Sequence, residues 1–136
     1  MKTQPYLSFE GRCEEALEFY RGALSAEVTS LMRYKEMPDS CAGTLGTEDK
    51  VMHSSFRIGD SEILASDGMC SGNPSFQGIS LTLSVPADDE AERLFAALAD
   101  GGQVQVPLTP TFFSSGFGIV ADRFGVSWML LVAPQS

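Results

Sequence analysis

The sequence predicts an α+β fold made of two tandem β-α-β-β-β modules, covering residues 1–77 and 78–136 of a single domain. Three observations favour this fold. Segments that alternate between apolar and polar residues, the period of a half-buried strand, recur along the chain. Two stretches carry apolar residues at the spacing of an amphipathic helix. The order of one strand, one helix and three strands occurs twice, as expected after a tandem duplication.

The first module begins with a predicted strand over 5–9 and a helix after Gly11. Acidic residues near the start of this helix suit the positive end of its dipole. The apolar stripe of the helix consists of Cys13, Ala16, Leu17, Tyr20 and Leu24. Gly59-Asp60 is a hairpin signal between two of the remaining strands. These strands are expected over 27–34, 50–58 and 61–66, and the segments 35–49 and 67–77, rich in turn residues, are expected to be loops.

The second module repeats this order. Its first strand, 79–85, alternates strictly, and the following helix ends at Gly101-Gly102. The apolar face of that helix consists of Ala91, Leu94, Phe95 and Leu98. Further strands are expected over 103–106, 118–121 and 126–132. We expect curved mixed sheets that enclose a ligand cavity, with the two halves closing over each other within one chain or across a dimer.

Composition limits the function. With 136 residues, 43% of them hydrophobic, the chain can bury a core without disulfides. Its net charge of −9 leaves no cationic stripe for a nucleic acid, and no apolar run approaches the ~20 residues of a membrane helix. The N-terminus lacks the apolar core of a signal peptide. We therefore expect a cytoplasmic protein that binds neither nucleic acid nor membrane.

The three cysteines, Cys13, Cys41 and Cys70, do not have the spacing of a zinc site or of a disulfide framework. Reduced thiols are the expectation. A Cys41–Cys70 disulfide is the alternative, because both residues lie in predicted loops.

Several segments, spread over the whole chain, resemble one protein family. They are Pro5-Tyr6-Leu7-x-Phe9-x-Gly11, Cys13-Glu14-Glu15-Ala16-Leu17-x-Phe19-Tyr20, Glu36-Met37-Pro38, Met52-His53 with Arg57-Ile58, Ser66-Asp67, Gly116-Phe117-Gly118 and the terminal Asp122-Arg123-Phe124-Gly125-Val126-Ser127-Trp128-Met129. Together they resemble the PhnB-like (demethylubiquinone methyltransferase-like) group of the vicinal oxygen chelate superfamily. That superfamily includes glyoxalase I, extradiol dioxygenases and bleomycin and fosfomycin resistance proteins. The resemblance implies paired β-α-β-β-β modules and a homodimer.

Metal-dependent members of the superfamily place His or Glu at four strand positions that face the cavity. By the resemblance, these positions fall on Gln4 or Pro5, Ile63, Ser80 and Met129. None of these is an ordinary ligand for a hard or borderline divalent ion, which prefers imidazole or carboxylate. We therefore expect no divalent metal and no other cofactor at the superfamily position.

If the superfamily geometry holds, strand alternation directs a set of side chains into the cavity. His53, the only histidine, is the candidate catalytic residue, because imidazole ordinarily titrates near neutrality. Arg57 suits a carboxylate or phosphonate, and Phe113 suits an aromatic lid. The candidate ligand-binding residues are Ser55, Arg57, Ile63, Ser80, Thr82, Phe113 and Met129. The alternatives are structural: a hydrogen-bonded His53 at a dimer seam, a surface ion pair of Arg57, and core packing of Phe113.

Four functional hypotheses follow. The first is a homodimeric small-molecule binding protein without a metal, which holds an anionic or aromatic metabolite, phosphonate-like by family analogy. The second is a lyase, isomerase or ring-cleaving enzyme with His53 as general base and Arg57 as anchor. The third is a metal enzyme whose metal ligands are residues other than those that the resemblance places at the four superfamily positions, because the alignment with the superfamily is shifted. The fourth, a structural dimer without a ligand, predicts a collapsed apolar cavity.

Overall fold

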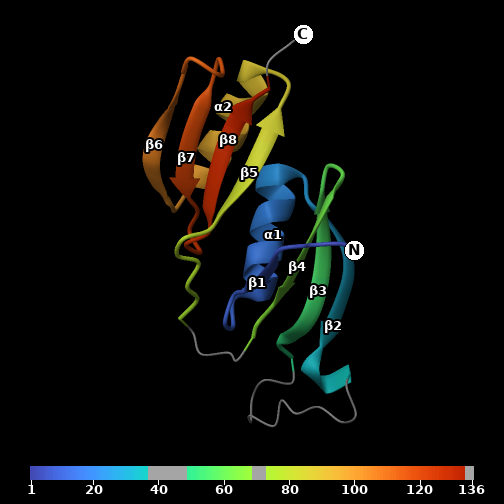
Figure 1. Ribbon diagram of the computed structural model, residues 1–136. Helices are drawn as coiled ribbons and strands as arrows, with labels where there is room; N and C mark the ends of the chain where they lie inside the picture. The colour runs from blue at the N-terminus through green and yellow to red at the C-terminus, as the bar shows by residue number, and fades with distance from the viewer. Residues whose placement is uncertain (37–48, 69–72, 134–136) are drawn as a thin grey trace. The chain divides into compact units, whose positions relative to one another are not determined.

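The computed structural model describes residues 1–36, 49–68 and 73–133. The chain divides into two compact units, Met1–Pro74 and Ser75–Ser136, close to the module boundary that the sequence predicts. Each unit has one α-helix and one four-stranded sheet, which can be followed in Figure 1. Both α-helices have 12 residues, and no helix in the described part of the chain is long and apolar enough to cross a membrane.

The first unit is built on a mixed sheet with the strand order β1-β4-β3-β2. Strand β1 is parallel to β4, and the other two pairs are antiparallel. Its elements are β1 (Tyr6–Ser8), α1 (Cys13–Leu24), β2 (Glu27–Arg33), the short 3₁₀ helix η1 (Tyr34–Glu36), β3 (Val51–Ile58) and β4 (Ser61–Ser66). The predicted strand ends lie within one residue of these bounds, and Gly59 has the positive φ of 57° that the hairpin turn requires.

Helix α1 covers one face of this sheet with the stripe that the sequence predicts. Tyr20, fully buried, stacks on Phe56 of β3 with ring centroids 5.8 Å apart and planes tilted by 17°. The buried residues of α1 are Cys13, Ala16, Leu17, Tyr20, Ala23 and Leu24. Burial of this stripe is the main source of stability for the helix, because a helix of this length is marginal alone in water.

The second unit has the equivalent order β5-β8-β7-β6, again with one parallel pair, β5 and β8. Its elements are β5 (Ser80–Val85), α2 (Asp88–Ala99), β6 (Gln103–Thr109), β7 (Phe117–Ala121) and β8 (Ser127–Val132). Strand β6 runs three residues further than predicted, through Pro107, which an edge strand tolerates. As in the first unit, the sheet has two unpaired edges and is not closed, so an enclosed cavity does not follow from either sheet itself.

Helix α2 buries the four predicted residues, Ala91, Leu94, Phe95 and Leu98. A Cβ atom on Gly118 of β7 would lie 2.8 Å from the Phe95 ring, so a glycine is required where the helix approaches the strand. On β8, Trp128 and Leu130 are buried, whereas Met129 between them is only half-buried. This alternation separates a helix-facing side from an opposite side.

Candidate functional site

Cross-strand register separates the two faces of the first sheet, because directly paired residues point to the same face. Phe56, which contacts α1, is paired with Ile63. Ser55 is paired with Leu64, and Leu64 with Tyr6 of β1. These residues therefore lie on the other side, which we call the face opposite α1. By register and alternation this face carries Tyr6, His53, Ser55, Arg57, Glu62 and Leu64.

Ile63 does not belong to the face opposite α1, so the expected direction of its side chain is wrong. Its side chain is 5% exposed and shares the core under α1 with its partner Phe56. Glu62 takes the place on the opposite face, paired with Arg57 in the register. The Glu62 carboxylate accepts a hydrogen bond from Gln4 Nε2 at 2.7 Å. A carboxylate therefore lies on the face where the family resemblance predicts the apolar side chain of Ile63.

His53 lies on the face opposite α1, half-buried, in the middle of β3. Its Nδ1 atom is 3.4 Å from the hydroxyl oxygen of Tyr6, and the two ring centroids are 5.8 Å apart. Tyr6 belongs to β1, which is separated from β3 by β4 in the sheet. The only histidine of the chain thus has a phenol as its hydrogen-bond partner.

Ser55 and Arg57, the other predicted residues of β3, both contact β2. The Ser55 hydroxyl is 2.7 Å from Thr29 Oγ1, and Ser55 is only 8% exposed. Arg57 Nη2 donates to Glu27 Oε2 at 3.1 Å, with about half of the arginine side chain exposed. Arg57 therefore forms the surface ion pair that was its structural alternative. Such exposed pairs contribute about 0–1 kcal/mol, so the pair is easily displaced by an anion.

The second sheet presents a different surface on the face opposite α2. The predicted residues Ser80, Thr82 and Met129 all lie on it, since Ser80 pairs with Ser127 and Thr82 with Met129. The Ser80 hydroxyl donates to Ser127 Oγ at 2.8 Å, and Thr82 donates to the Met129 sulfur at 3.8 Å. Ile119 of β7 pairs with Met129 and extends this face. The surface is apolar with a border of hydroxyl groups.

Phe113 lies in the connection between β6 and β7, at one end of the same sheet. Its ring makes an edge contact with Phe117 at 5.3 Å and with Phe112 at 5.1 Å. Phe113 is 44% exposed, so it is not a core residue, and Phe112 is fully exposed. Both rings line a hollow of about 670 Å³, which the segment from Pro86 to the first residue of α2 and the end of β8 complete. Small-molecule sites have volumes of this order.

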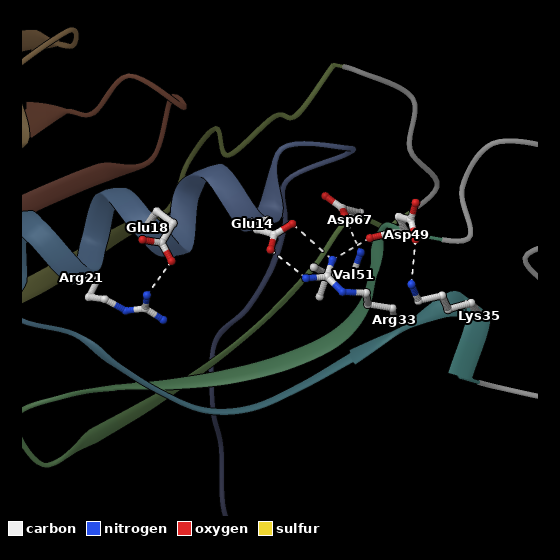
Figure 2. A network of polar contacts seen from close by, with 8 residues as sticks. All are labelled: Glu14, Glu18, Arg21, Arg33, Lys35, Asp49, Val51 and Asp67. Carbon is white, nitrogen blue, oxygen red and sulfur yellow. Dashed lines mark hydrogen bonds and ion pairs between the residues drawn. The ribbon is translucent and has the colours of Figure 1, made fainter.

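A polar network holds the start of α1 against β3 and β2 (Figure 2). Asp67, 1% exposed, accepts hydrogen bonds from the backbone N–H groups of Cys13 at 2.7 Å and Val51 at 2.6 Å. Glu14 forms a bidentate pair with Arg33 at 2.7 and 3.2 Å. That hydrogen-bonded guanidinium holds the pKa of the Glu14 carboxyl below its ordinary value. Asp67 is occupied by backbone N–H groups and Glu14 by Arg33, which indicates a structural role for these contacts.

The Cys13 thiol lies inside the first unit and is fully buried. Burial raises its pKa to about 12, against the contact with Ser54 Oγ at 3.8 Å, which acts in the opposite direction. A thiol with so high a pKa stays protonated at neutral pH and is a poor nucleophile. Cys41 and Cys70, whose pairing was the alternative, and the Met37-Pro38 part of the family motif lie outside the described residues.

The structure adds two residues that the sequence prediction missed, Tyr6 and Glu62. The predicted hairpin at Gly59-Asp60 contained the signal for Glu62, because a two-residue turn pairs Ile58 with Ser61 and hence Phe56 with Ile63. No local signal joins Tyr6 to His53. Within residues 1–36, 49–68 and 73–133, no three His, Cys, Asp or Glu side chains form a group that could hold a metal ion.

Residues 1–131 match a protein family described as 3-demethylubiquinone-9 3-methyltransferase. Protein YjdN of Escherichia coli K12 is 36% identical, over 99% of this chain and 97% of its own. A PhnB protein from Bacillus cereus is 32% identical with a TM-score of 0.81, covering 98% of this chain and 100% of its own. A crystal structure from Pseudomonas aeruginosa is 37% identical with a TM-score of 0.86, covering 99% of both chains.

More distant structures share the fold alone. The fosfomycin resistance protein FosX from Mesorhizobium loti is 12% identical with a TM-score of 0.64, over 98% of this chain and 92% of its own. The two repeated modules, each with a four-stranded mixed sheet and one helix, are thus the arrangement of the glyoxalase and FosX fold.

Proposed function

The chain belongs to the 3-demethylubiquinone-9 3-methyltransferase family, a PhnB-like group within the vicinal oxygen chelate superfamily, and on that premise we propose that it is a small-molecule binding protein for an anionic or aromatic metabolite. In this proposal it acts in the cytoplasm as a homodimer and needs no resident divalent metal. Binding is preferred to methyl transfer because the sequence contains no G-x-G-x-x-G loop.

The observation that carries the proposal is the polar character of the face opposite α1. Arg57 and His53 lie on this one face, and Arg57 is the residue suited to gripping an oxyanion bidentately. Its present partner Glu27 is 69% exposed, so exchange of this ion pair for an anionic ligand costs little. The face opposite α2 offers Met129 and Ile119, which suit an aromatic ring.

One observation favours a second function, acid–base catalysis on the same face. His53 is in contact with a second proton-carrying group, the Tyr6 hydroxyl. Histidine and tyrosine are both side chains that can serve as general acids or bases. In this alternative His53 is the catalytic residue, and Arg57 holds the substrate.

The proposal is tested with phenylphosphonate, an aromatic oxyanion, and with benzyl alcohol as a neutral aromatic control, by isothermal titration calorimetry. We expect phenylphosphonate to bind the wild type and the Arg57→Gln variant to bind it about tenfold more weakly, the loss of one charge-assisted contact. Benzyl alcohol should bind both proteins equally. Arg21→Gln is the matched control, because Arg21 forms an exposed ion pair with Glu18 on α1.

Equal affinity of the wild type and Arg57→Gln for phenylphosphonate would contradict the proposed anion site. Conversion of an added substrate, followed by ³¹P NMR, would favour the catalytic alternative. Native mass spectrometry of protein purified without chelators tests the rest of the proposal. One divalent metal per subunit would overturn the metal-free proposal, and a monomer would overturn the homodimer.

A further inference from the structure

Tyr6 and His53 meet on the face opposite α1, although 47 positions of sequence separate them. Tyr6 is held in β1 by its pairing with Leu64, and His53 is held in β3 by its pairing with Met32. The Tyr6 hydroxyl reaches His53 Nδ1 at 3.4 Å, with the rings tilted by 39°. Both rings are thus fixed by regular strands, which position side chains more precisely than loops do.

The direction of this hydrogen bond follows from the chemistry of the two groups. A neutral imidazole has one N–H donor and one bare nitrogen acceptor, and a phenol can donate or accept. The bare nitrogen of a neutral imidazole is a better hydrogen-bond acceptor than a neutral phenol oxygen, and a phenol O–H is a good donor. The favoured arrangement therefore has Tyr6 donating to a bare Nδ1, which leaves the proton of the neutral ring on Nε2.

We infer that Tyr6 is a positioning residue that holds His53 in the Nε2–H tautomer, so that His53 offers an N–H donor to an oxyanion. The inference rests on the proposed function for the identity of that oxyanion. Within the described residues, His53 makes no other hydrogen bond and no ion pair, so Nε2 has no protein partner there. The ligand class is a carboxylate, phosphonate or similar group that accepts hydrogen bonds.

This tautomer also separates the two candidate functions. A general base needs a bare nitrogen directed at the proton that it removes. In the Nε2–H tautomer the bare nitrogen is Nδ1, and the Tyr6 hydroxyl occupies it. His53 is therefore a binding group toward an anion, and Tyr6 selects this role by its hydroxyl alone.

The test is the tautomer of His53, measured by two-bond ¹H–¹⁵N correlation NMR at about pH 9, where an ordinary imidazole is neutral. The spectrum needs no assignment strategy, since the chain has one histidine. We expect the Nε2–H form to dominate in the wild type. In Tyr6→Phe the ratio of Nε2–H to Nδ1–H should fall about fivefold, the factor that one hydrogen bond of ordinary strength contributes.

Tyr34→Phe is the matched control, because the Tyr34 hydroxyl donates to the Gly68 carbonyl at 2.6 Å and not to the imidazole. Its tautomer ratio should equal that of the wild type. Tyr6 is 49% exposed, so the phenylalanine variant keeps its fold, which the backbone ¹H–¹⁵N spectrum verifies. A dominant Nδ1–H form in the wild type, or an unchanged ratio in Tyr6→Phe, would overturn the inference.

Because this measurement needs no ligand, its failure is distinct from failure of the proposed function. Calorimetry with phenylphosphonate then tests whether the tautomer of His53 affects binding of the anion. If His53 donates to the anion, the apparent affinity is proportional to the fraction of the Nε2–H form, so Tyr6→Phe should weaken binding by the factor by which the NMR spectra show that fraction to fall. The wild type could show the expected tautomer and yet not bind phenylphosphonate. That result would contradict the proposed ligand class but not the role of Tyr6 in selecting the tautomer. A change in affinity that does not match the change in the Nε2–H fraction would overturn the donor role.

Discussion

The two units share one construction on the helix side of their sheets and differ on the other side. Each helix packs its apolar stripe onto a sheet with a single parallel pair. In each unit a buried aspartate, Asp67 or Asp122, accepts hydrogen bonds from three N–H groups. The face opposite α1, in contrast, carries His53, Arg57 and Glu62, where the face opposite α2 carries hydroxyl groups, methionine and isoleucine.

This contrast indicates on which face of each sheet functional side chains can lie. Side chains under a helix must fill a close-packed interior, so their size and polarity are constrained in both units. Side chains on the opposite face carry no such constraint, and duplicated modules are free to diverge there. The polar residues on the face opposite α1 are therefore candidates for binding a ligand through polar contacts. The apolar residues on the face opposite α2 are candidates for shape complementarity to a ligand.

The largest expected effect comes from neighbouring residues of β8 that point to opposite faces. Leu130→Ala removes a fully buried side chain under α2 and should lower the free energy of unfolding by about 2–5 kcal/mol. Met129→Ala changes the half-buried opposite face and should cost about 1 kcal/mol or less. Urea denaturation followed by far-UV circular dichroism measures both values. Equal costs would remove the distinction between the two faces.

The second effect concerns the buried aspartates. In Asp67→Asn one amide N–H₂ must face a backbone N–H, so the free energy of unfolding should fall by about 2–3 kcal/mol. Asp122→Asn should cost a similar amount, because its carboxylate also holds three donors, one of them Trp128 Nε1 at 2.8 Å. Asp60→Asn in the exposed hairpin turn is the control, with an expected change within about 0.5 kcal/mol. A small effect at only one aspartate would break the parallel between the units.

The smallest effect is the pH dependence of the Glu14–Arg33 pair. The pKa of Glu14 is lowered in the folded protein by Arg33, so its stabilisation is fully present above the ordinary value of 4.5 and is lost as the pH falls through the lower folded value. Because the Glu14 side chain is 59% exposed, Glu14→Gln should cost only about 0.5–1 kcal/mol at pH 7. The difference from wild type should shrink below pH 4.5.

Glu90→Gln is the control for this pair in the second unit. Glu90 also lies in the first turn of its helix, yet within the described residues it forms no ion pair. Both substitutions remove a favourable interaction with the helix dipole, so the difference between them isolates the contribution of Arg33. Chemical denaturation at several pH values between about 3 and 7 measures both, and identical pH profiles would show that the ion pair contributes nothing.

Much of the fold could be predicted from local patterns. The helix stripes through Tyr20 and through Leu94 are those observed, because a period of 3.6 residues specifies one buried face. The face of Ile63 was predicted wrongly because a residue position was transferred from distant relatives, while the hairpin turn at Gly59-Asp60 indicated the correct pairing with Phe56. The C-terminal half of β6 was missed because Pro107 resembles the end of a strand.

The sequence alone determined which residues form the helices, which strands form the hairpin, and which side of each helix is buried, since these depend on neighbours within a few positions. Tertiary structure alone decided the strand order β1-β4-β3-β2, which brings Tyr6 to His53. It also decided that Arg57 of β3 pairs with Glu27 of β2. These are contacts between strands that lie far apart in sequence, and no local period encodes which strands become neighbours.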